Sequence, residues 1–202
     1  MSTQLAWHWL GSAPYQRVLA DQLAARERVW AGEPGVVYLC EHLPVITLGR
    51  SATTANVIAA GDVPVVRIER GGEVTYHGPG QLMIYAIVRL TSVVGFLERV
   101  AGAIVDACAA LGVHGAAWQR DPAGVWRDGA KLAACGIHIA RRVPVHGFAL
   151  DVATPREAWR RIKPCGLDLP QISISRALER PISVERVAIE VGPRVVAALS
   201  TL

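Results

Sequence analysis

The stretch Arg70-Gly71-Gly72-Glu73-Val74-Thr75-Tyr76-His77-Gly78-Pro79-Gly80-Gln81 is the most distinctive part of this chain. Its four glycines in twelve residues allow sharp turns and let the backbone approach a ligand closely. It matches neither the GxxxxGK[ST] pattern of phosphate-binding loops nor the GxGxxG pattern of dinucleotide-binding folds. A long hairpin with a packed tyrosine is the structural alternative. Because loops so often carry function, we interpret the stretch as a ligand-binding loop.

Helix and strand patterns alternate on both sides of this loop. Apolar side chains recur at helical spacing from Val94 to Leu111, and Gly112 follows them, which predicts a helix over 94–111. Strands mixed with a few helices predict an α+β domain built on a mixed sheet. Further helices are expected at 14–31, 155–162 and 183–200, and strands at 36–41, 45–48, 65–69, 82–90, 124–127, 131–140 and 146–152.

The composition is that of a globular protein, and the length suits a single domain over residues 1–202. Apolar residues make up 51% of the chain, which is enough to build a sizeable core. Lys and Arg outnumber Asp and Glu by 21 to 17, a formal net charge of +4. This mild excess favours an acidic partner, but it is too small to indicate nucleic-acid binding.

The four cysteines and the N-terminus predict the compartment. Cys40, Cys108, Cys135 and Cys165 form no CxxC pair and no zinc-ligand spacing, so we expect reduced thiols and no metal site. The N-terminus has neither the basic start nor the long apolar run of a signal peptide. No apolar stretch of about 18 residues could span a membrane. We therefore expect a cytoplasmic protein that binds no membrane.

Cys165 is expected at a bend, unlike Cys108, which lies on the apolar stripe of the predicted helix. Pro164 favours an extended residue before it, and Gly166 permits a turn directly after it. Most free cysteines are inert and pack as small apolar side chains. A cysteine at a bend is nevertheless a candidate nucleophile, provided that its surroundings stabilise the thiolate.

Lys131 begins the strand expected at 131–140. Strand periodicity predicts that Lys131 shares the more apolar face of the strand with Ala133, Cys135, Ile137 and Ile139. On that face the ammonium group would be partly desolvated, which would lower the pKa of Lys131 and favour the neutral amine. The structural alternative is a lysine at a strand end that extends to water. His77 and His146 each precede a glycine and could hydrogen-bond a loop, assist a cysteine or bind a metal, of which structural hydrogen bonding is the simplest.

Several other stretches accompany the glycine-rich loop in a fixed order. They are residues 41–50, Gly124-Val125-Trp126, residues 131–139, residues 146–152 and Pro164-Cys165-Gly166. With these stretches, the chain resembles the lipoyl (octanoyl) transferase family from about residue 36 to 176. The resemblance implies the fold of biotin and lipoate protein ligases, a mixed β-sheet flanked by helices.

The resemblance also implies the site residues. Cys165 would be the nucleophile that carries the acyl group, and Lys131 its activating partner. The substrate pocket would be formed by Arg70, Gly71, Gly72, Glu73, Val74, Thr75, Tyr76, His77, Ala134, Cys135, Gly136, Gly147, Phe148 and Ala149. Two positions depart from the family pattern: Asp151 stands where Asn is usual, and Cys135 where a larger aliphatic residue is usual.

The implied reaction is an acyl transfer that needs no cofactor, neither ATP nor a metal. The donor would be octanoyl-acyl carrier protein, and the acceptors would be lysines of the lipoyl domains of 2-oxoacid dehydrogenase complexes and of the glycine cleavage H protein. One alternative is an ATP-dependent lipoate- or biotin-type ligase on the same fold. Such ligases do not continue the glycine-rich segment as His-Gly-Pro-Gly-Gln and need no cysteine at position 165. A non-catalytic acyl-binding protein is a third possibility.

Overall fold

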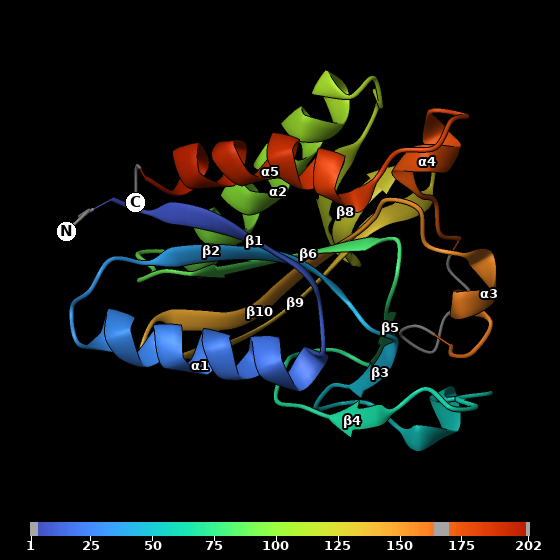
Figure 1. Ribbon diagram of the computed structural model, residues 1–202, viewed down its shortest axis with the longest axis horizontal. Helices are drawn as coiled ribbons and strands as arrows, with labels where there is room; N and C mark the ends of the chain where they lie inside the picture. Colours follow the sequence, from blue (N-terminus) through green and yellow to red (C-terminus); the bar gives the residue numbers. More distant parts are fainter. Residues whose placement is uncertain (1–3, 164–169, 201–202) are drawn as a thin grey trace.

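A computed structural model describes residues 4–163 and 170–200. The described part of the chain forms a seven-stranded sheet, a three-stranded sheet and helices around them (Figure 1). The strands are β1 (Ala6–Ala13), β2 (Val36–His42), β3 (Val45–Leu48), β4 (Val65–Arg67), β5 (Val74–His77), β6 (Gln81–Ile87), β7 (Ala117–Arg120), β8 (Ala123–Arg127), β9 (Ala130–Ala140) and β10 (Val143–Asp151). The helices are α1 (Tyr15–Trp30), the 3-10 helix η1 (Thr54–Asn56), α2 (Val93–Ala110), α3 (Arg156–Trp159), α4 (Ile174–Ala177) and α5 (Val184–Leu199).

The large sheet is mixed. Its strand order is β1-β2-β6-β10-β9-β8-β7, in which β1 runs parallel to β2 and the other pairs are antiparallel. The expected α+β class with a mixed sheet flanked by helices is therefore confirmed. None of the helices in the described ranges is both long and apolar enough to cross a membrane.

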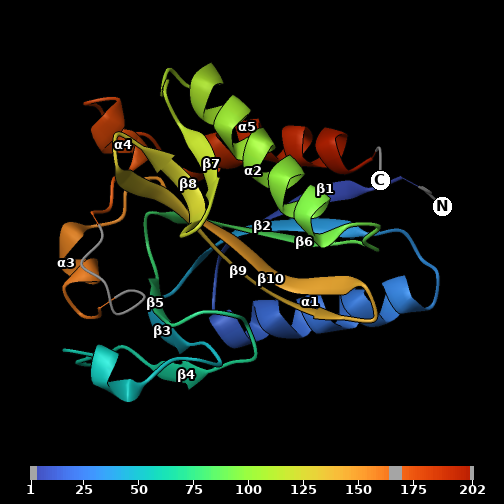
Figure 2. The same cartoon turned by 180° about the vertical axis from the view of Figure 1, so that it is seen from behind.

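Helices cover both faces of the large sheet. Helices α2 and α5 lie on one face and α1 on the other, as the two opposite views show (Figures 1 and 2). The larger core forms under α2 and α5, where Phe96 and Ile104 pack against Leu132 and Phe148. A smaller core forms under α1, around Val18. Alternate residues of each strand thus enter different cores.

The three-stranded sheet projects from one end of the large one. β3 lies in its centre, parallel to β4 and antiparallel to β5. Its apolar residues Ile46 and Tyr76 pack with Ala158 of α3 and the nearby Ile162. The turn at Pro44 therefore transfers the chain from one sheet to the other instead of joining two paired strands.

Five elements among the described residues were not predicted from the sequence. They are β1, η1, β5, β7 and α4, each with a mixed or short pattern. β5 corrects the interpretation of residues 70–81 as loop throughout, because residues 74–77 form a strand paired with β3. Only the glycine-containing segments on either side of β5 remain irregular.

Candidate active site

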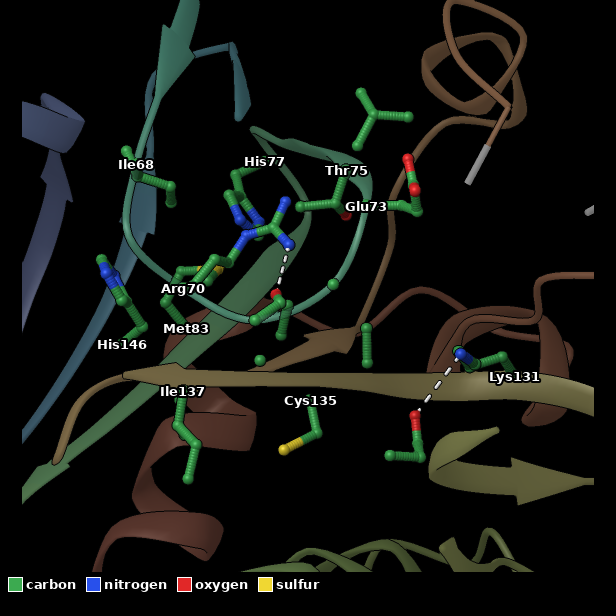
Figure 3. A pocket seen from close by; sticks show the side chains of 18 of the residues that line it. Ile68, Arg70, Glu73, Thr75, His77, Met83, Lys131, Cys135, Ile137 and His146 are labelled. Atoms are coloured by element: carbon green, nitrogen blue, oxygen red, sulfur yellow. Dashed lines mark hydrogen bonds between the residues drawn. The ribbon is translucent and has the colours of Figure 1, made fainter. Parts of the chain in front are cut away.

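A cavity of about 420 Å³ lies between the segment from Ile68 to His77 and strands β9 and β10 (Figure 3). This volume is within the range of small-molecule sites, which is roughly 300 to 1,000 Å³. Lys131 lines one part of the cavity, and Tyr15 and His146 line another. Among the described residues, it unites segments that are far apart in the sequence.

Small residues form the floor of the cavity. Ala134 and Gly136 of β9 stand opposite Ala149 and Gly147 of β10, and all four line the cavity. A Cβ atom at Gly136 would lie 3.3 Å from Cδ of Arg70, and one at Gly147 would overlap the carbonyl oxygen of Ile84. These glycines therefore let the loop and the next strand approach the floor closely.

Arg70 fixes the loop above this floor. Its Nη2 atom donates to the carbonyl oxygen of Thr47 at 2.9 Å and to Oγ1 of the same residue at 3.0 Å, which joins the loop to β3. Its Nη1 atom donates to the carbonyl oxygen of Gly71 at 3.0 Å. The amide of Gly71 in turn donates to the carbonyl oxygen of Ile137 on β9, at 3.1 Å. The loop is thereby hydrogen-bonded to both sheets.

Lys131 lies on the opposite face of β9 from the one predicted. Trp126 pairs with Lys131, but its neighbour Val125 pairs with Ala133, so β9 contains an additional residue, Leu132. Because Trp126 and Val125 point to opposite faces, their partners do too. The prediction that Lys131 shares a face with Ala133 is therefore wrong, and the β-bulge, which no spacing rule revealed, is the reason.

The bulge directs Lys131 into the cavity, where its side chain is buried. The residue is 6% exposed, its Nζ atom donates to the carbonyl oxygen of Ala123 at 3.4 Å, and Nζ lies 4.8 Å from the centre of the Trp126 ring. A Cβ atom at Gly124 would stand 3.3 Å from Cε of Lys131, so the glycine leaves room for the lysine chain. The alternative of a lysine that extends to water is wrong.

The backbone of Lys131 holds the segment that follows Cys165. Its amide donates to the carbonyl oxygen of Pro170 at 2.8 Å, and its carbonyl oxygen accepts from the amide of Ile172 at 3.0 Å. On the other side of the gap, the amide of Lys163 donates to the carbonyl oxygen of Asn56 at 2.8 Å. Cys165 itself lies outside the described residues.

The histidines form a buried polar end of the cavity. Burial lowers the pKa of His77 to about 3 and that of His146 to about 4, so both imidazoles are uncharged near neutral pH. Nδ1 of His146 lies 3.3 Å from the hydroxyl oxygen of Tyr15. The backbone of His146 is left-handed, with φ at 62°, and its amide donates to Oε1 of Gln22 at 2.7 Å. These contacts support structural hydrogen bonding as the role of His146, and the hydrogen bond between His77 and Gln81 supports the same role for His77.

Asp151, a departure from the family pattern, ends a chain of hydrogen bonds that begins at His77. Oδ1 of Asp151 accepts from Nε2 of Gln81 at 2.9 Å and from the hydroxyl of Thr154 at 2.7 Å. Oε1 of Gln81 is thereby directed to His77, whose Nδ1–H donates to it at 2.7 Å. Burial raises the pKa of Asp151 from 3.8 to about 7, although both of its donors act in the opposite direction.

Twelve of the fourteen pocket residues expected from the sequence line this cavity, and Tyr76 and Phe148 do not. Both alternate with lining residues along their strands, so they point the other way. Tyr76 packs edge-on against Trp159 at a ring distance of 6.4 Å, and Phe148 packs against Trp118 at 5.9 Å. The lining residues that sequence reasoning missed include Tyr15, Ile68, Met83, Tyr85, Trp159 and Gln171. Strand alternation could have found Met83 and Tyr85, which share a face of β6.

Comparison with solved structures defines the class of fold. The chain resembles P. falciparum LipL1 in complex with lipoate, with a TM-score of 0.75, 11% sequence identity and coverage of 98% of this chain and 63% of that one. It also resembles lipoate-protein ligase A bound with ATP, with a TM-score of 0.62, 13% identity and coverage of 100% and 85%. The fold is therefore that of the lipoate protein ligases.

Sequence comparison then identifies the family. The model of the lipoyl protein ligase A/B catalytic domain matches residues 13–192, so the chain belongs to this family. The octanoyltransferase of Gloeobacter violaceus is 40% identical over 189 residues, which cover 90% of this chain and 79% of that protein. The octanoyltransferase of Methylibium petroleiphilum is 35% identical over 223 residues, 95% and 96% of the two chains. The resemblance seen in the sequence is confirmed, and the chain is an acyltransferase of the octanoyltransferase type.

The floor of the cavity gives a first prediction. Replacing Ala134 by Leu should fill space that an acyl chain would occupy and slow octanoyl transfer at least about tenfold, since excluding two methylenes costs about 1.6 kcal/mol. Ala130→Leu is the control, because Ala130 lies on the same strand, is likewise partly exposed and does not line the cavity. Transfer rate and melting temperature would be measured for both. Equal loss of activity in the two variants would contradict a substrate-binding floor.

Asp151 gives a second prediction. Because its pKa is raised on folding, the unfolded chain ionises first, and the free energy of unfolding falls as pH rises from about 4 to 7. Above pH 7 the cost reaches about 4 kcal/mol, the order of a three-unit shift. Asp151→Asn keeps an oxygen acceptor for Gln81 and Thr154 but does not titrate, so it should be more stable than the wild type at pH 8. Most of that difference should disappear at pH 4.5.

Urea unfolding at pH 4.5, 6 and 8 would check this expectation. The exposed Asp106 provides the control variant, Asp106→Asn, which should show no such pH-dependent gain. The neutral histidines also make stability depend on pH, but they do so equally in the wild type and the variant. A constant difference between wild type and Asp151→Asn at all three pH values would show that Asp151 is ionised throughout.

Proposed function

We propose that this acyltransferase takes an octanoyl group from the thioester of acyl carrier protein onto Cys165 and transfers it to a lysine of a lipoyl domain. The observation that carries the proposal is the position of Lys131. Its amine is buried at a cavity with a floor of small residues, and its backbone binds Pro170, five residues after Cys165 in the sequence. This anchoring supports a cysteine–lysine pair at the cavity.

In the first step Lys131 accepts the proton of the Cys165 thiol. The thiolate attacks the carbonyl carbon of the octanoyl thioester, and the carrier's pantetheine thiol leaves with a proton. One thioester is exchanged for another, so the step is nearly neutral in energy and requires no external energy source. Backbone amides near the glycine-rich loop could stabilise the oxyanion that forms during the attack.

In the second step the ε-amine of the acceptor lysine attacks the acyl-enzyme. The C–S bond breaks, an amide forms and Cys165 recovers its proton, while Lys131 serves as general base for the incoming amine. Amide formation from a thioester is favourable, which makes the overall transfer downhill. The enzyme therefore needs two protein substrates in succession and one acyl-binding cavity.

The cavity suits an unbranched acyl chain. Its floor carries only small side chains, and Ile68 and Met83 add apolar walls. Each methylene group buried there contributes about 0.8 kcal/mol to binding. The substrate-binding residues that we propose are the twelve predicted ones that line the cavity.

Both protein partners are expected to be acidic. The donor would be octanoyl-acyl carrier protein, and the acceptors would be lipoyl domains of 2-oxoacid dehydrogenase complexes and the glycine cleavage H protein. Exposed basic side chains close to position 165 in the sequence, Arg156, Arg160 and Lys163, fit such partners. We place this activity in the cytoplasm, in a single catalytic domain over residues 1–202.

ATP-dependent ligation is the second candidate activity, because solved ligases share the fold. The experiment that separates the two is incubation with octanoyl-acyl carrier protein and an apo lipoyl domain, without ATP. We expect an octanoylated lipoyl domain. Product formed only from free octanoate and ATP would establish a ligase, and absence of product under either condition would establish a non-catalytic binding protein.

The acyl-enzyme gives a third prediction. Octanoyl-acyl carrier protein alone should add one octanoyl mass to the enzyme, and peptide mapping should place it on Cys165. Cys40 and Cys108 are fully buried, and burial raises the pKa of the Cys135 thiol to about 12, so none of these should compete. Cys165→Ala should abolish both the adduct and transfer. Transfer that survives in this variant would contradict the assignment.

Lys131 gives a fourth prediction, since a base is needed to form the thiolate. Lys131→Ala should slow alkylation of Cys165 by iodoacetamide near neutral pH and move the midpoint of alkylation to higher pH. Lys131→Arg should not restore transfer, because arginine keeps its proton at any working pH. The control is Lys163→Ala, which removes an equal charge from an exposed side chain two residues before Cys165. An unchanged alkylation profile in Lys131→Ala, with transfer intact in Lys131→Arg, would disprove the pair.

A further inference from the structure

The pairing between β8 and β9 ends in the middle of the cavity wall. The last paired residues are Gly124 and Ala134, whereas β9 continues to Ala140 with β10 on its other side. The next residues along each strand, Ala123 and Cys135, both line the cavity. A gap between the two strands therefore opens beside the site of Lys131.

The cavity continues through this gap to the other face of the sheet. Cys135 and Ile137 point away from Arg70 and its loop (Figure 3) and pack against the core beneath α2. Leu97 of α2 also lines the cavity, although α2 covers the face opposite the loop. Cys135 is partly exposed as a residue, and it lines the cavity together with Ala123.

An apolar groove begins where the gap ends. It has a volume of about 200 Å³ and shares Leu97 and Ala123 with the main cavity. Val94 and Trp118 form its other apolar walls. At its rim Nη2 of Arg120 and Oε1 of Glu98 form an ion pair at 2.5 Å, so these two charges face each other.

We propose that this gap and groove bind the methyl end of acyl chains longer than octanoyl, and that Cys135 keeps the passage open. The inference rests on the proposed acyl transfer. The main cavity would hold the first methylenes near Lys131, and the groove under the β7–β8 hairpin would hold those beyond them. The enzyme should then accept decanoyl and dodecanoyl donors as well as octanoyl.

The chemistry of the lining favours an acyl chain over the pantetheine arm of the carrier. The arm contains two amides, and burying an amide without a hydrogen-bond partner costs several kcal/mol by transfer measurements. Methylene groups form no hydrogen bonds, so burying them against apolar side chains carries no such cost. Along the gap the side chains of Leu97, Ala123 and Cys135 provide no strong hydrogen-bond donor or acceptor. Because the groove is continuous with the cavity next to Lys131, we assign it to the methyl end of the same acyl chain.

The experiment compares acyl donors of 8, 10 and 12 carbons on the wild-type protein and on two variants. Cys135→Ile narrows the gap, and Val94→Trp fills the outer groove. The readout is the ratio of dodecanoyl to octanoyl transfer rate, because a ratio is insensitive to a general loss of activity. Each buried methylene is worth about fourfold in binding, so both variants should lower the ratio at least about tenfold.

A neighbouring residue provides the matched control. Val93 and Val94 both lie in the first turn of α2 and are 43% and 47% exposed, but only Val94 lines the groove. Val93→Trp should leave the ratio unchanged. The proposal is overturned if wild-type protein transfers octanoyl but not dodecanoyl groups, or if the ratio is the same in all variants. Failure of the wild-type protein to transfer any acyl group would instead overturn the proposed function.

Discussion

The cavity depends on the hydrogen bonds that Arg70 makes inside the protein. Its guanidinium group binds Thr47 of the small sheet and the carbonyl oxygen of Gly71, while the amide of Gly71 binds Ile137 of the large sheet. The loop is thus suspended between two sheets above a floor of small residues. Without these bonds the loop could collapse onto the floor, since glycines offer no side chains to keep the space open. A buried guanidinium, with its five donors in a rigid plane, is well suited to this task.

The second constraint is the β-bulge at Leu132. One additional residue in β9 moves Lys131 to the cavity face while Leu132 and Ala133 stay in the core under α2. The same strand then loses its partner β8 after Ala134, which opens the gap beside Cys135. A single irregular strand therefore supplies the buried amine, half of the cavity floor and the passage to the groove. Regular pairing along all of β9 would have closed that passage.

Sequence reasoning predicted the class of fold and half of the residues that line the cavity, but it could not predict the local irregularities. Long periodic segments such as α2 and β9 were found because their apolar patterns agree with their burial. β1 and β5 were missed because Trp7, His8 and Thr75 interrupt any clear alternation. The bulge was missed because an additional residue leaves no composition signal in an apolar strand. Tyr76 and Phe148 were assigned to the pocket through neighbours in their motifs, although alternation along a strand turns them away.

The electrostatic balance of the cavity follows from the same packing. His77 and His146 are buried without charge, and the positive charge of Arg70 lowers the pKa of both further, after desolvation. Arg70 thus remains a charged group beside two neutral imidazoles. Charges interact strongly in a buried site, because little water is present to screen them. A negative group, such as a thiolate or the oxyanion of a thioester under attack, is favoured near such a cation. The hydrogen bonds that hold the loop in place therefore also fix a positive charge in the wall of the cavity.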